Sequence, residues 1–62
     1  MPSRYEDRIY GMLSREPITP NEVALKLGVN HKTAMRALMR LALTREDVHY
    51  KNSGRIHMFW RE

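Results

Sequence analysis

Gly28 separates two short segments of helical pattern, and this turn constrains the fold more than any other feature. The segment before it opens with Thr19, Pro20 and Glu22, a typical capping box with proline at the first helical position. Gly28 can take the left-handed backbone conformation that ends a helix sharply. Asn30 can then cap a second helix directly after the turn. The pattern therefore predicts two helices joined by a tight corner.

Each of these helices has an apolar inner face at helical spacing. The inner positions are Val23, Ala24 and Leu27 before the turn, and Ala34, Ala37, Leu38 and Leu41 after it. Val29 fills the corner, and the small side chains of Ala24 and Ala34 allow the two helices to cross closely. We expect the second helix to run from His31 to about Leu43.

The outer face of the second helix is polar and basic, in a chain whose net charge is +4. It carries His31, Lys32, Arg36 and Arg40. Between Val23 and Arg45 every charged residue is basic. Phosphate binding requires a basic surface. Charge alone, however, is equally consistent with a solvated helix face that has no ligand.

A further helix is predicted before this pair. Ser3 to Glu6 forms a second capping box, so this helix should begin near Arg4. Its predicted core-facing residues are Tyr5, Ile9, Met12 and Leu13. Pro17 ends the helix, and Ile18 is predicted to form a very short strand.

The last segment alternates between apolar and polar residues, which predicts a β-hairpin. The alternating residues are Val48, Tyr50, Ile56, Met58 and Trp60, whereas Phe59 breaks the pattern. A three-residue loop ending in Gly54 would pair Val48 with Met58 and Tyr50 with Ile56. In this register His49 lies opposite His57, and Phe59 lies on the outer face.

The order helix, short strand, helix, helix, hairpin resembles the winged helix-turn-helix DNA-binding domain of small prokaryotic (bacterial, archaeal or viral) transcriptional regulators. Ala24, Gly28, Val29 and Ala34 match that pattern. The resemblance implies an α+β, mainly helical fold: one domain over residues 1–62, with three helices and a C-terminal two-stranded hairpin as the wing. One departure is that residues 43–48 contain no glycine to turn the chain into the wing, which leaves the angle of the wing open.

The resemblance implies a DNA-binding surface in which residues 31–43 enter the major groove and the wing, residues 48–60, contacts the backbone or minor groove. Its residues are Asn30, His31, Lys32, Thr33, Met35, Arg36, Arg40, Lys51 and Arg55. Arg36 is suited to guanine and Met35 to a thymine methyl group. Asn30 and Thr33 reach phosphates, or Asn30 only caps the helix. Lys51 and Arg55 bind DNA, or they protect an edge strand.

The expected function is sequence-specific binding of double-stranded DNA by a small transcriptional regulator. A homodimer is also expected, because one recognition helix covers only a few base pairs and because Tyr10, Met39 and Phe59 lack an obvious place in the core. The alternative is that these three are scattered surface residues. Two other functions stay open: a winged-helix protein-interaction module, or an RNA-binding module within a larger complex. The basic outer face of the second helix argues against the protein-interaction module. Exposed aromatic residues on the wing would favour RNA binding, and only Phe59 is a candidate for such a residue.

Composition and motif content also limit the location of the protein and the kinds of site that we expect. The chain has no cysteine, no long apolar run and no signal-peptide pattern, so we expect a cytoplasmic protein without a membrane contact. No catalytic constellation stands out, and we expect no enzyme activity, no cofactor and no small-molecule ligand. His49 and His57 lack a third ligand, so no metal site is expected either.

Overall fold

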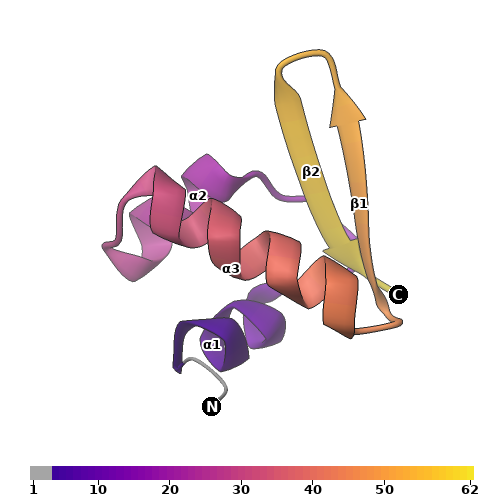
Figure 1. Ribbon diagram of the computed structural model, residues 1–62, viewed down its shortest axis with the longest axis horizontal. Helices are drawn as coiled ribbons and strands as arrows, with labels where there is room; N and C mark the ends of the chain where they lie inside the picture. Colours follow the sequence, from indigo (N-terminus) through magenta and orange to yellow (C-terminus); the bar gives the residue numbers. More distant parts are fainter. Residues whose placement is uncertain (1–3) are drawn as a thin grey trace.

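The computed structural model describes residues 4–62 and has three helices followed by an antiparallel hairpin (Figure 1). The helices are α1 (Arg4–Met12), α2 (Pro20–Leu27) and α3 (His31–Thr44), and the strands are β1 (Val48–Ser53) and β2 (Ile56–Arg61). The predicted fold class, α+β and mainly helical with a two-stranded C-terminal wing, is confirmed. Figure 1 shows α1 below α3 and the hairpin, called the wing from here on, upright beside α3.

The corner between α2 and α3 forms as its local sequence requires. The Thr19 hydroxyl accepts a hydrogen bond from the backbone N–H of Glu22 at 3.3 Å. Gly28 has a φ of 70°, in the left-handed region that favours glycine. The Asn30 side chain accepts from the N–H of Thr33 at 2.8 Å and so caps α3. Both predicted caps and the predicted turn are confirmed.

A single cluster of buried apolar residues holds the helices and the wing together. Its members are Ile9, Leu13, Val23, Ala24, Ala34, Ala37, Leu38, Leu41, Val48 and Phe59. The prediction that Tyr5 belongs to the core is wrong, because this side chain is 42% exposed. The capping box predicted for α1 begins at Ser3, which lies outside the described residues.

The segment directly after α1 contacts the far end of the chain. The helix stops at Met12, before Pro17. The Ser14 carbonyl accepts a hydrogen bond from the N–H of Arg61 at 2.8 Å, so the backbone here is tied to β2. Ile18 then pairs with Phe59 through two hydrogen bonds of 2.8 and 2.9 Å. The short strand predicted at Ile18 is confirmed.

The predicted register of the hairpin is wrong. Val48 lies opposite Arg61 instead of Met58, and Tyr50 lies opposite Phe59 instead of Ile56. The connection is a two-residue turn at Gly54 and Arg55, in which Gly54 has a φ of 65°. Glycine at the first central position suits a type II′ turn.

This change of register moves every β2 side chain to the other face of the hairpin. Phe59, predicted to face outward, is 0% exposed and is the largest fully buried side chain. Ile56, predicted to face the core, is 55% exposed. The bridge to Ile18 explains the difference, because it holds Phe59 at the edge of the helical core. His49 accordingly lies opposite Trp60, and the predicted His49–His57 pair does not form.

The chain enters the wing without a glycine, through a turn at Glu46 and Asp47 that is anchored to α1. The N–H of Val48 donates to the Arg45 carbonyl at 3.3 Å. The Tyr10 hydroxyl donates a hydrogen bond to the Asp47 carboxylate. That hydrogen bond, together with nearby arginines, holds the pKa of the Asp47 carboxyl below its ordinary value. The connector therefore sets the position of the wing relative to α1.

Tyr10 has a structural role that the sequence did not reveal. The guanidinium groups of Arg45 and Arg61 both lie over its ring, with central carbons 4.8 and 4.5 Å from the ring centroid. Both Tyr10 and Met39 are partly buried against the core, and Phe59 is part of it. The expectation that these three side chains lie unused on the surface, one of the two grounds for the homodimer prediction, is therefore wrong.

Candidate nucleic-acid interface

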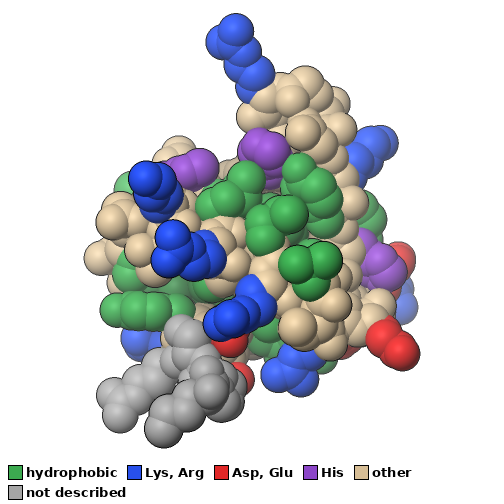
Figure 2. Space-filling view, in the orientation of Figure 1, with side chains coloured by type: hydrophobic (Ala, Val, Ile, Leu, Met, Phe, Trp, Pro, Cys, Tyr) green, Lys and Arg blue, Asp and Glu red, His purple; other side chains and the backbone are tan. Residues whose placement is uncertain are grey.

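Three predicted DNA-binding residues form a line along α3. Lys32, Arg36 and Arg40 are spaced by one turn each, and all three are exposed. We call them the cation row. Figure 2 shows basic side chains following α3 across the face of the molecule. Because α3 contains no acidic residue, no carboxylate of the same helix neutralises this row.

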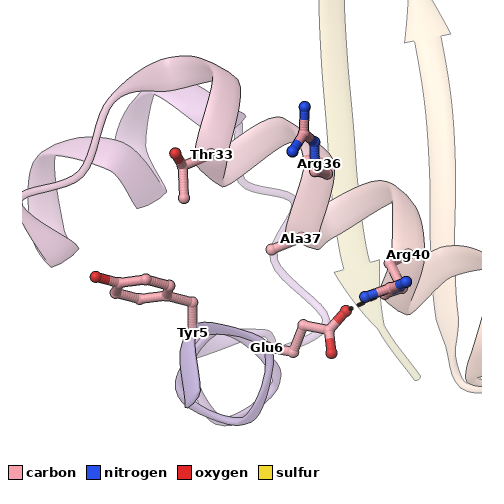
Figure 3. Close-up of a pocket in the computed structure, with 6 residues that line it drawn as sticks. All are labelled: Tyr5, Glu6, Thr33, Arg36, Ala37 and Arg40. Carbon is pink, nitrogen blue, oxygen red and sulfur yellow. Dashed lines mark ion pairs between the residues drawn. The ribbon is translucent and has the colours of Figure 1, made fainter. Parts of the chain in front are cut away.

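Arg40 also contacts α1. Its Nε atom lies 3.6 Å from Oε1 of Glu6, whose side chain is only 12% exposed, whereas that of Arg40 is 66% exposed (Figure 3). An ion pair of this kind contributes little to stability, typically about 0–1 kcal/mol. The contact nevertheless brings the Arg40 side chain toward α1.

The N-terminal part of α3 lies above a shallow hollow shared with α1. This hollow has a volume of about 120 Å³ and is lined by Tyr5, Glu6, Thr33, Arg36, Ala37 and Arg40. Figure 3 shows the Thr33 side chain on the side of α3 that faces α1, while the Arg36 guanidinium points away from α1. Thr33 is half-buried. Thr33 and Arg36 thus both border this hollow, although the Arg36 guanidinium points away from α1.

A second hollow brings the predicted residues His31 and Arg55 together. It has a volume of about 200 Å³ and is lined by Thr19, Pro20, Asn21, His31, Arg55, Ile56 and His57. The starts of α2 and α3 both border it, and helix N-termini favour negative charge. With Arg55 at the same place, these surroundings favour an anionic group such as a backbone phosphate.

His57 is a candidate site residue that sequence reasoning missed. Its Nδ1 atom lies 2.6 Å from the hydroxyl of Tyr50, and the two share a hydrogen bond. The Tyr50 ring in turn packs on Phe59, with centroids 4.9 Å apart. His57 therefore has a fixed orientation beside the second hollow. Only the correct register could have placed it there, because the predicted one set it opposite His49.

The two basic residues of the wing are in different positions. Lys51 lies opposite Met58, on the hairpin face away from Tyr50 and Phe59. Arg55 lies in the turn itself and borders the second hollow. Both are exposed. The two side chains therefore belong to different parts of the wing surface.

The outer face of α3 is less uniformly basic than predicted. It also carries three apolar residues spaced by one turn each, Met35, Met39 and Leu43, which we call the apolar row. Met35 and Met39 are half-buried and Leu43 is 82% exposed. Figure 2 shows apolar surface between the basic side chains on α3 and the wing. The regular spacing was visible in the sequence, but only Met35 was assigned to DNA.

Residues 4–62 contain neither a metal-binding cluster nor a membrane-spanning helix. No group of three His, Asp or Glu side chains is arranged there to hold a metal ion. None of the helices in this range has the length and apolar character needed to cross a membrane.

Comparison with known proteins identifies no relative of this chain. We find no significant match to the chain among protein-family models, curated proteins or solved structures. Interpretation of the interface therefore depends on the geometry and chemistry of its own residues.

Proposed function

We propose that this protein binds double-stranded DNA sequence-specifically and acts as a small cytoplasmic transcriptional regulator of the winged helix-turn-helix type. In this proposal α3 enters the major groove, and the wing contacts the backbone or the minor groove. The observation that carries the proposal is the cation row, exposed on a helix without acidic residues whose first residue, His31, shares a hollow with Arg55 of the wing turn.

The dimensions of α3 support this function. A helix of 14 residues is about 21 Å long, and with side chains it is about 10–12 Å wide. The major groove of B-DNA is about 12 Å wide. Recognition helices contact bases mainly with their N-terminal residues, and in α3 that part presents His31, Lys32, Met35 and Arg36. Arg36 has the freedom to approach guanine, because it points away from α1.

Two copies are expected to act together on DNA. One recognition helix covers only a few base pairs, so specific binding usually needs a second copy on an adjacent half-site. Tyr10, Met39 and Phe59, the residues predicted to form a dimer surface, are partly or fully buried. The argument from the small number of base pairs that one helix covers does not depend on them. We therefore keep a DNA-supported homodimer as part of the proposal.

A protein-interaction module is the second candidate function. The apolar row favours it, because apolar surface on an exposed helix often binds partner proteins. The RNA-binding alternative loses Phe59, the aromatic candidate named from the sequence, because this side chain is buried; on the wing Tyr50 is 37% exposed instead.

Selection from a random library of duplexes tests the proposal directly. We expect an enriched motif, with twofold symmetry if two copies bind. Affinity should fall with salt with a log–log slope of about −3 to −5 per bound monomer, because each neutralised phosphate contributes roughly 0.9. Arg36→Ala should relax the preference at one base position. Absence of any enriched motif, together with salt-independent binding, would overturn the proposal and favour the protein-interaction module.

A further inference from the structure

The apolar row and the cation row run side by side along the same exposed helix. Lys32, Arg36 and Arg40 form one, and Met35, Met39 and Leu43 form the other. Helical spacing places the two rows next to each other on the outer face of α3, and Figure 2 shows apolar side chains between the basic side chains on α3 and the wing. A duplex held by the cation row would therefore cover the apolar row as well. The inference below rests on the proposed function, because it identifies the DNA group that would contact this apolar surface.

Among the base edges of the major groove, thymine alone presents an apolar group, its C5 methyl. The other edges offer hydrogen-bond donors and acceptors, which lose water at a cost when they are covered without a partner. A methionine side chain has no donor and only a weak acceptor. Met35 and Met39 are therefore unfavourable over a G·C pair and favourable over a thymine methyl. We infer that Met35 and Met39 form a thymine-methyl reader, which makes them specificity-determining residues of α3.

The structure holds these two side chains in place from below. Both are partly buried and pack against the core cluster, so only part of each side chain remains free to meet DNA. Residues one turn apart are about 6 Å apart along a helix, and stacked bases are about 3.4 Å apart. Met35 and Met39 can thus contact two thymines, one or two steps apart. The adjacent cation row supplies the charge complementarity that brings this apolar surface onto a polyanion.

Replacing thymine by deoxyuridine removes only the methyl group and keeps base pairing. We would select binding sites in parallel from random duplex pools made with thymidine or with deoxyuridine triphosphate. The thymidine pool should yield a motif with thymines that the deoxyuridine pool loses. Burial of one methyl group corresponds to about a fourfold change in affinity, so each contacted thymine should lose about fourfold on replacement.

Variants then assign the effect to these side chains. The ratio of affinities for the thymine and deoxyuridine forms of one selected duplex does not depend on the fraction of folded protein. In Met35→Ala with Met39→Ala this ratio should fall to about one. In the control Leu25→Ala, which removes an exposed apolar residue from α2, it should stay as in the wild type. Circular dichroism checks that each variant is folded.

The outcomes separate this inference from the proposed function. A motif of equal strength in both pools, or a ratio unchanged by the double substitution, would overturn the methyl reader and leave sequence-specific binding intact. No motif in either pool would overturn the proposed function itself, and the methyl reader with it. Loss of the thymine preference in the double variant alone would support the inference.

Discussion

The buried position of Phe59 makes the strongest prediction about this fold. Phe59 is 0% exposed, whereas Ile56 of the same strand is 55% exposed. Truncating a buried phenylalanine to alanine costs about 3–5 kcal/mol. At about 0.05–0.15 kcal/mol per residue, a chain of 62 residues has a free energy of unfolding of roughly 3–9 kcal/mol. Phe59→Ala should therefore remove between about a third and all of the free energy of unfolding.

Phe59→Leu is the measurable form of this test, since it should cost about 1–1.5 kcal/mol. In a domain of this size each kcal/mol lowers Tm by about 4–8 °C, so we expect a loss of roughly 4–12 °C. Ile56→Ala is the matched control, and its effect should be within about 0.5 kcal/mol, as for other exposed positions. Thermal unfolding followed by circular dichroism measures both.

The register predicted from sequence reverses this order, because it buries Ile56 and exposes Phe59. If Ile56→Ala lowered Tm more than Phe59→Leu, the argument from burial would be refuted. A second copy of the chain covering Ile56 would produce a concentration-dependent Tm, so the measurement is made at two protein concentrations.

Three further predictions concern the Asp47 anchor, the glycines and the wing. The lowered pKa of Asp47 means that its contribution to stability is present above pH 3.8, its ordinary value, and is lost as the pH falls toward the folded-state pKa; Asp47→Asn should flatten the fall in Tm below that pH. Gly54→Ala should destabilise the protein by about 1 kcal/mol because its φ is 65°, whereas Gly11→Ala, at an open helical position, should stabilise it by up to about 1 kcal/mol in urea denaturation. Lys51→Ala with Arg55→Ala should reduce the salt slope of DNA binding by about one to two units, and an unchanged slope would remove the wing from the interface.

The α2–α3 corner could be predicted because its causes are local. Caps act over three residues, and a glycine with positive φ is required by the backbone at one position. The Thr19 cap, the Gly28 turn and the Asn30 cap all depend on neighbours in sequence. The surface position of the cation row is equally local, because long charged side chains on the polar face of a helix stay in water.

The register of the wing could not be predicted because β2 contains Met58, Phe59 and Trp60 in succession. Alternation within such a run favours either face, so a contact from elsewhere must decide between them. Here the backbone of Ile18 pairs with Phe59 and carries it into the core. That choice then placed His57 beside His31 and Arg55. Local sequence determined the helices and the charges on their surfaces. The register of the wing and the lining of the second hollow were decided by contacts between distant segments, because these segments bury a shared core.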